Sequence, residues 1–450
     1  MKRETLSVKR DALSVGLWRP FWLGVVICFA AGAASGAELK VDGLRCEYRA
    51  EPLGIDTPQP RLSWRLESAE RGQAQTAFQI LAAEAPQNLV EGKADLWDSG
   101  KVGSSKSLHV VYEGKPLRSG LRVYWKVRAW DKSGRTTDWS RPASWEMALL
   151  AQEDWQAQWL TRKRPQPLSD QEMFGDHPAP LYRKEFALEK PIRRARLYVT
   201  GLGYSELSLN GQRVGDHVLD PGWTSYSKRV LYSTYDVTGQ LQRGRNALGV
   251  ILGNGWFNPL PLRMFGQFNF RQYLTIGEPR LILKLVVEFA DGTERTIATD
   301  PSWRLADGPI LRNNLYLGEV YDARRALNGW DRPGFDDSQW EQAVVATEPL
   351  GPLRAQSAPP IRVTRTLKPL AVTEPRPGVF IFDFGQNFAG WASLRVAGPA
   401  GTRVRMRYGE LLYPDGTLNG MTSVAGQIKQ GGARSITLRA STFEGSVLLS

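Results

Sequence analysis

Alternating hydrophobic and polar residues recur in short runs along the chain, and the first cluster of such runs precedes residue 150. Leu62, Trp64 and Leu66 alternate with polar residues, and the longer run from Tyr124 to Trp130 alternates in the same way. Runs with a period of two, separated by turn residues, are typical of half-buried β-strands. Several such strands carrying tryptophans predict a fibronectin-III or immunoglobulin-like β-sandwich over residues 38–150.

A second set of alternating runs contains the two clearest hairpin signals. Leu207, Leu209 and Val214 flank Asn210-Gly211, the dipeptide that best fits a type I′ turn. A second hairpin is predicted around Asp291-Gly292, between the apolar run ending at Ala290 and a polar strand. We expect these strands to close into a jelly roll over residues 181–346, of the kind seen in galactose-binding domains.

A third group of alternating runs follows residue 360. Val379–Asn387, Trp391–Val396 and Val404–Glu410 predict a further β-sandwich over residues 361–429. Proline-rich stretches predict linkers at 151–180 and 347–360, and 430–450 forms a divergent tail. No heptad pattern or long amphipathic helix is visible, so we expect an all-β chain of tandem sandwiches.

The amino terminus adds a targeting segment to this organisation. Five basic residues precede or flank the apolar run Phe21–Ala34, and the small residues Ser35-Gly36-Ala37 follow it. This order predicts a signal peptide over residues 1–37, with an uncleaved membrane anchor as the alternative. We therefore expect a secreted or periplasmic protein with no membrane contact after cleavage. Cys46 would then be its remaining cysteine, which excludes an intramolecular disulfide.

The net charge does not indicate a nucleic-acid partner. The formal charge of +12 falls to about +9 without the leader, which holds five basic and two acidic residues. The excess is spread along the chain, and its densest cluster, Arg162-Lys163-Arg164, lies in a predicted linker. A nucleic-acid surface requires a basic stripe on one structural element.

Aromatic and amide side chains gather in residues 223–258 and provide the candidate chemistry. Trp223, Asn254, Trp256 and Asn258 form the predicted sugar-binding set. An aromatic ring packs on the C–H face of a pyranose, and amides pair with its hydroxyls. The alternative is that the aromatics belong to the sandwich core. The three histidines are scattered along the sequence, which argues against a metal triad or a Ser-His-Asp arrangement.

Ordered motifs across these regions resemble those of the bacterial α-L-rhamnosidases. They include Pro60–Trp64, Gly201–Tyr204, Leu209–Gly211, Pro221–Thr224, Tyr235–Thr238, Leu252–Trp256, Gly318-Glu319, Tyr321–Arg324, Phe382–Asn387, Arg407–Glu410 and Gly426–Lys429. The resemblance implies a multidomain glycoside hydrolase that removes terminal α-L-rhamnose with inversion. Such an enzyme needs a general acid and a general base.

In that family both groups come from a helical toroid that follows the β-domains, so we expect this chain to be the non-catalytic front half. Asp383 and Glu410 are the strongest candidate pair of carboxylates within it, but each is also explained as a turn or strand-end group that pairs with a nearby arginine. No catalytic residue is predicted here. The expected partner is a rhamnose-containing glycan or glycoside. A stand-alone secreted carbohydrate-binding protein is the alternative, and a scaffold without a ligand is a third.

The resemblance also raises the question of calcium. In some relatives a jelly roll binds rhamnose with a calcium ion held by asparagine, aspartate and backbone oxygens, which are hard ligands. The matching positions imply Asn210 and Asn258 as calcium ligands, with Trp223 or Trp256 as the stacking platform. A structural role for this loop is the alternative. No cofactor is required by the rest of the sequence.

Overall fold

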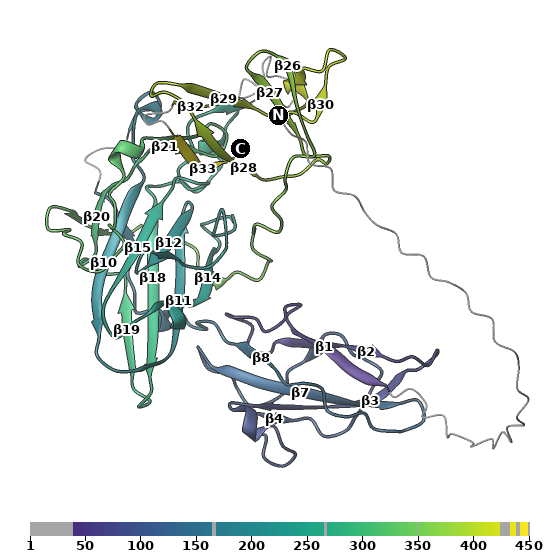
Figure 1. The fold of residues 1–450 in the computed structure, drawn as a ribbon. Helices are drawn as coiled ribbons and strands as arrows, with labels where there is room; N and C mark the ends of the chain where they lie inside the picture. Colours follow the sequence, from purple (N-terminus) through teal and green to yellow (C-terminus); the bar gives the residue numbers. More distant parts are fainter. Residues whose placement is uncertain are drawn as a thin grey trace, which may run out of the picture.

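The computed structural model describes residues 39–163, 168–264, 268–348, 350–423, 433–437 and 442–448 (Figure 1). Within these ranges every long element is a β-strand, and the helical segments are short 3₁₀ turns. The all-β prediction is confirmed. The predicted signal peptide lies outside the described residues. No helix in the described ranges is long and apolar enough to cross a membrane.

The first domain is a two-sheet sandwich, drawn in purple and blue in Figure 1. The alternation predicted from Tyr124 to Trp130 is confirmed, because Trp125, Val127 and Ala129 are fully buried while their neighbours are not. Burial also raises the pKa of Cys46, a free thiol in the core. One sheet has the order β1-β2-β6 and the other β4-β3-β7-β8, with β5 beside β3: β1 (Lys40–Cys46), β2 (Arg61–Glu67), β3 (Gln75–Ala83), β4 (Trp97–Asp98), β5 (Val102–Gly103), β6 (Val110–Val111), β7 (Arg122–Asp131) and β8 (Ala143–Glu146).

The second domain is a sandwich of a six-stranded and a seven-stranded sheet around the largest hydrophobic core, in which Leu197, Leu248 and Leu283 are fully buried. The first sheet has the order β13-β12-β15-β10-β20-β23: β10 (Pro180–Leu188), β12 (Ser205–Leu209), β13 (Gln212–Arg213), β15 (Gly244–Leu252), β20 (Arg304–Asp307) and β23 (Glu341–Gln342). The second has the order β24-β9-β18-β11-β14-β25, with β19 beside β18: β9 (Leu160–Thr161), β11 (Ile192–Leu202), β14 (Val230–Asp236), β18 (Arg280–Phe289), β19 (Glu294–Ala298), β24 (Val344–Val345) and β25 (Leu353–Ala355).

Both predicted hairpins are confirmed. Asn210 and Gly211 have φ angles of 56° and 77°, as a type I′ turn requires, and they join β12 to β13. Gly292, with φ of 82°, closes the turn between β18 and β19.

The two predicted linkers are corrected by the structure, because each contributes a strand to the second domain. Residues 151–180 contain β9, which pairs with β18 and β24. Residues 347–360 contain β25, which runs parallel to β14. Strands of two or three residues are too short to show a hydrophobic period, and proline-rich surroundings concealed them further.

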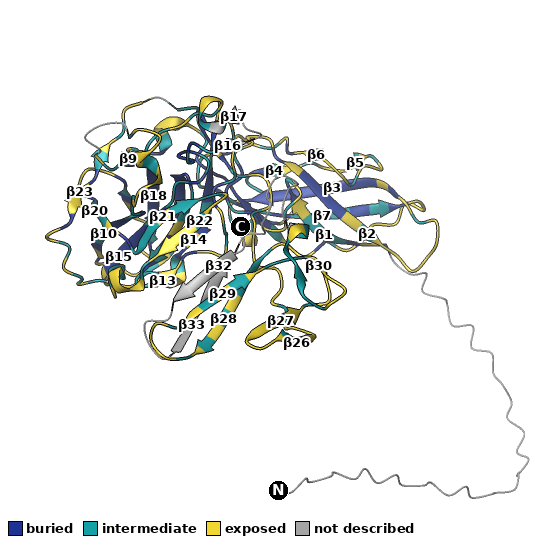
Figure 2. Ribbon diagram, turned by 90° about the horizontal axis from the view of Figure 1, so that it is seen from above, coloured by how far each residue is buried: buried dark blue, intermediate teal, exposed yellow. Residues whose placement is uncertain are grey.

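The third region consists of four strand pairs in the described residues: β26 (Ala371–Arg376) with β27 (Val379–Asp383), β28 (Trp391–Ala397) with β33 (Thr442–Leu448), β29 (Arg403–Arg407) with β32 (Ala433–Thr437), and β30 (Leu411–Leu412) with β31 (Leu418–Asn419). Two further pairs belong to loops of the second domain: β16 (Arg263–Met264) with β17 (Phe268–Asn269), and β21 (Ile310–Asn314) with β22 (Gly318–Tyr321). In Figure 2 the strands from β26 onward are teal or yellow where their burial is described. Between Gln356 and Thr422 no side chain is buried, so the predicted third sandwich forms strands without a closed core in the described residues.

Buried charges join the first two domains. Glu146 of β8 is 2% exposed and accepts hydrogen bonds from Arg196 of β11, with both Arg196 Nε and Nη2 at 2.5 Å. Arg194 reaches the same carboxylate at 3.3 Å. The Tyr232 hydroxyl accepts a hydrogen bond from the backbone N–H of Leu149 at 3.1 Å. These contacts fix one end of the second domain against the first.

Candidate functional site

Three aromatic side chains meet at one end of the second domain and form what we call the aromatic ledge: Trp223, Trp256 and Tyr316. The Trp223 and Trp256 rings are stacked, with centroids 4.5 Å apart and planes 17° from parallel. The Tyr316 ring meets Trp256 edge-on at 6.1 Å. Trp223 is 50% exposed and Tyr316 is 45% exposed. The two predicted sugar-binding tryptophans are therefore adjacent. Trp223 is accessible, whereas Trp256 is partly buried against a hydrophobic cluster and also has a packing role.

Close backbone packing holds the loop that carries Trp256. Gly253 donates its N–H to the Tyr204 carbonyl at 2.7 Å, and Gly203 donates to the Gly253 carbonyl at 3.2 Å. A Cβ atom at Gly203 would lie 2.1 Å from the Asn254 carbonyl oxygen, so only glycine permits this approach. The loop is thereby anchored to the turn that follows β11.

The two predicted sugar-binding asparagines support this loop from within. The backbone N–H of Asn254 donates to Asn313 Oδ1 at 2.6 Å, and its side-chain amide donates to the Asn313 carbonyl at 3.0 Å. Asn258 Nδ2 donates to Asn254 Oδ1 at 3.2 Å, while Arg271 donates to Asn258 Oδ1 at 2.9 Å. Both asparagines lie near the ledge, but their side-chain groups are engaged in holding the loop and the β21–β22 hairpin.

The structure does not bring the two predicted calcium ligands together. Asn210 follows Leu209, which pairs with Leu248, whereas Asn258 follows the opposite end of β15. The Asn210 side chain bonds to Gln240 and Asn246 and accepts from the Ala247 N–H. A guanidinium beside Asn258 Oδ1 further opposes a cation there. In the described ranges, no cluster of three or more His, Cys, Asp or Glu side chains is arranged to hold a metal ion.

Sequence reasoning missed two aromatic members of the site. Tyr316 lies in the turn between β21 and β22, sixty residues from Trp256, and only the fold brings them together. The Tyr204 hydroxyl is hydrogen-bonded to the Trp256 indole, and burial raises the pKa of Tyr204. An indole N–H only donates, so the hydroxyl accepts and helps to fix the ring. The available sequence signal was Tyr316 itself, an aromatic residue in the turn-forming stretch that runs from Asn313-Asn314 to Gly318.

Asp383 and Glu410, the two candidate carboxylates of the third region, make local hydrogen bonds. Asp383 is exposed at the end of β27 and accepts from the Gly385 N–H at 2.7 Å. Glu410 is also exposed and accepts from Asn387 Nδ2 at 3.1 Å. The turn and strand-end positions agree with the expectation, but the partners shown are a backbone N–H and an asparagine amide rather than the expected arginines.

A more buried polar cluster secures the junction between the second domain and the third region. Asp220 Oδ2 accepts from the Ser233 hydroxyl at 2.6 Å, and burial together with the Asp220 charge raises the pKa of Tyr235. His217 Nδ1 lies 2.9 Å from the Tyr235 hydroxyl, and His217 forms an isolated β-bridge with Arg362. The arrangement holds the 214–222 loop, which leads to Trp223.

Three sequence families match successive parts of the chain. Residues 41–151 match the Rha78A-like N-terminal immunoglobulin domain, residues 190–365 the α-L-rhamnosidase N-terminal domain, and residues 373–437 the bacterial α-L-rhamnosidase concanavalin-like domain. Among curated relatives, an α-L-rhamnosidase of Formosa agariphila is 35% identical over 87% of this chain and 43% of its own length. One from Streptomyces avermitilis is 32% identical over 84% of this chain and 52% of its own.

Solved structures show the same likeness. The α-L-rhamnosidase of Dictyoglumus thermophilum superposes with a TM-score of 0.76 at 38% identity, covering 90% of this chain and 46% of that one. The Streptomyces avermitilis enzyme complexed with L-rhamnose gives 0.78 at 30% identity, covering 91% and 54%. The chain therefore spans about half the length of these relatives.

Proposed function

The chain belongs to the bacterial α-L-rhamnosidase family, and from that premise we propose that it serves the hydrolysis of terminal α-L-rhamnosyl residues by binding the glycan. Its relatives are named for the hydrolytic activity, but this chain matches only about half of each. In this proposal the bond-breaking groups lie outside the chain, and its β-domains hold and orient the sugar.

The aromatic ledge carries this proposal. The exposed face of Trp223, stiffened by the stacked Trp256 ring behind it, offers a flat apolar surface. A pyranose presents an apolar C–H face of similar dimensions, and an aromatic ring packs on it while the hydroxyls stay in water. L-rhamnose has a methyl group in place of a hydroxymethyl, so it presents additional apolar surface to such a platform.

The positions of Asp383 and Glu410 in the third region support the proposal that the catalytic groups lie outside this chain. An inverting glycosidase places its acid and base about 6.5–9.5 Å apart across a space for substrate and water. Asp383 and Glu410 are exposed at strand ends, where each accepts a hydrogen bond from a neighbouring loop. Neither carboxylate is buried, and neither lies in an apolar pocket of the kind that holds a general acid.

Calorimetric titration of the full chain with methyl α-L-rhamnopyranoside tests the proposal, beside an assay on an aryl α-L-rhamnoside. We expect binding without turnover, and roughly tenfold weaker binding by Trp223→Ala because the stacking surface is removed. Trp139→Ala, a change of a partly buried tryptophan in the first domain, is the matched control. Turnover by the purified chain, or a Trp223→Ala variant that binds as well as the parent, would contradict it.

A carbohydrate-binding protein that acts without a catalytic domain is the second candidate. The closed core of the second domain favours it, because that domain is packed around its own two sheets. Sequencing the transcript beyond codon 450 distinguishes the two candidates. An in-frame helical domain with paired carboxylates supports the hydrolase, and a confirmed stop codon supports the binding protein.

We also infer that the mature protein acts outside the cytoplasm, as a secreted or periplasmic protein. The basic and apolar leader supports this localisation. Cell fractionation followed by amino-terminal sequencing provides the test. A mature terminus near Glu38 outside the cytoplasm is expected, and an intact Met1 in the cytosol would contradict it.

A further inference from the structure

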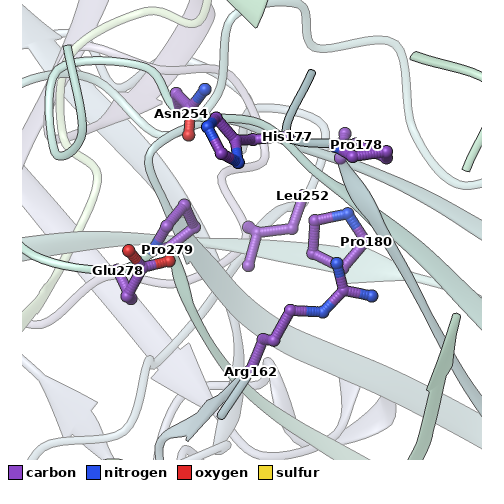
Figure 3. A pocket seen from close by; sticks show the side chains of 9 residues that line it. Arg162, His177, Pro178, Pro180, Leu252, Asn254, Glu278 and Pro279 are labelled. Carbon is purple, nitrogen blue, oxygen red and sulfur yellow. The ribbon is translucent and has the colours of Figure 1, made fainter. Parts of the chain in front are cut away.

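A small cavity lies next to the loop that carries Asn254 and Trp256, between β9, the segment before β10 and the start of β18 (Figure 3). The space open to the centre of a water molecule is about 10 Å³, which suits one oxygen atom of water size. Its apolar wall is formed by Leu252 and several prolines, and Arg162, His177, Asn254 and Glu278 provide its polar groups.

Arg162 lines this cavity and carries two hydrogen-bond donors that have no partner among the described residues. Its Nη1 group is paired with Asp307 Oδ1 at 2.6 Å. Its Nε and Nη2 atoms are buried and have no hydrogen-bond partner in the described part of the chain. Nε–H and Nη2–H form one edge of the planar guanidinium, so both donors can point at a single oxygen or at a pair of adjacent oxygens. Buried donors of this kind strongly favour an acceptor.

Acceptors lie on the other side of the same cavity. Figure 3 shows the Glu278 carboxylate facing the space from the wall opposite Arg162. The His177 Nε2 atom lies 2.7 Å from the Glu172 carbonyl, which can only accept, so Nε2 carries the proton and Nδ1 of the neutral ring is an acceptor. With Asp307 and Glu278 near one arginine, the local charge disfavours an anion. A group that both accepts and donates fits best.

We propose that this cavity is a subsite for one hydroxyl group of a second sugar unit, next to the unit that packs on the aromatic ledge. The hydroxyl oxygen accepts from Arg162, and its proton is donated toward Glu278 or His177. Asn254 forms part of the cavity wall and Trp256 follows it in the same loop, so the two subsites adjoin. The inference rests on the proposed function and adds that the preferred ligand is a disaccharide or longer glycan.

Comparing L-rhamnose with an α-linked L-rhamnose disaccharide by calorimetric titration of the full chain tests this subsite. We expect the parent to bind the disaccharide about tenfold more tightly, as a hydrogen bond to a charged group would provide. Arg162→Gln should remove that preference and leave monosaccharide binding unchanged. Arg162→Lys keeps a positive charge for Asp307 but lacks the two-donor edge, so it should remove the preference as well. Asp307→Asn breaks the ion pair with Arg162 but keeps the two-donor edge of the guanidinium, so this variant should still prefer the disaccharide.

The outcomes separate the subsite from the ledge. A parent without preference for the disaccharide, or an Arg162→Lys variant that retains it, would overturn the subsite whatever Trp223→Ala does. Loss of preference in both arginine variants with unchanged binding by Trp223→Ala would retain the subsite and reject the ledge. Absence of binding to either sugar would reject both.

Discussion

The second domain and the third region have similar strand patterns and opposite burial. In β18, eight of the ten residues from Arg280 to Phe289 are buried, because a second sheet covers one face and the first domain and loops cover much of the other. In β27, Val379 is 48% exposed, Phe380 is 56% exposed and Phe382 is 53% exposed. The comparison shows that runs of apolar, β-branched and aromatic residues form strands, whereas burial requires a second layer with complementary side chains.

The largest expected effect comes from opening the core of the second domain. Leu283→Ala should lower the free energy of unfolding by about 4 kcal/mol, since it removes a fully buried side chain and leaves a cavity. Phe382→Ala in the third region should change it by less than about 0.5 kcal/mol, because that ring is half exposed. Urea unfolding followed by tryptophan fluorescence measures both. Equal losses would show that the third region is packed as tightly as the second domain.

The next effect concerns how the second domain is joined to its neighbours. Glu146→Gln should cost about 3 kcal/mol, because it removes the buried charge paired with Arg196 and leaves that guanidinium only its half-exposed partner Asp236. Arg362→Ala, at the junction with the third region, should cost no more than about 1 kcal/mol, because its ion pair with Asp216 is exposed. Thermal unfolding of both variants makes the comparison. An Arg362→Ala variant as unstable as Glu146→Gln would contradict it.

Low pH should destabilise the contacts between the first and second domains before it destabilises their cores. The Ser119 hydroxyl, 2.5 Å from Asp154 Oδ2, together with backbone N–H groups, holds the pKa of Asp154 below its ordinary value. The stabilisation is therefore present above the unfolded-state pKa, near 3.8, and is lost as the pH falls through the lower folded-state pKa. Asp154→Asn should flatten the dependence of unfolding free energy on pH below about 4. If Asp154→Asn leaves the pH dependence of the unfolding free energy below about 4 unchanged, other carboxylates are responsible for that dependence.

Metal removal should have the smallest effect. Asn210 and Asn258 lie at opposite ends of the β12–β15 pair, and ring stacking at the ledge needs no cation. Methyl α-L-rhamnopyranoside should therefore bind equally well with calcium and with a chelator. Calcium-dependent affinity would instead indicate a metal site that neither asparagine prediction located.

Much of the fold was predictable because its signals are local. Asn210-Gly211 and Asp291-Gly292 specify their turns through backbone conformations that few other residues adopt. The run from Tyr124 to Trp130 specifies a strand with one buried face. The very short strands β9 and β25 could not be predicted, since pairing with distant partners rather than local pattern creates them.

The site divides in the same way. The sequence by itself identified Trp223 and Trp256 as candidates, because aromatic residues beside amides and glycines suit sugar recognition. Only the tertiary structure stacked the two rings and brought Tyr316 to their edge. It also engaged Asn254 and Asn258 in holding the loop and placed Arg162 and Asn254 on the same small cavity. The residue type determines which ligands a side chain can bind. The folded chain then determines which polar atoms remain available, because its internal hydrogen bonds occupy the others.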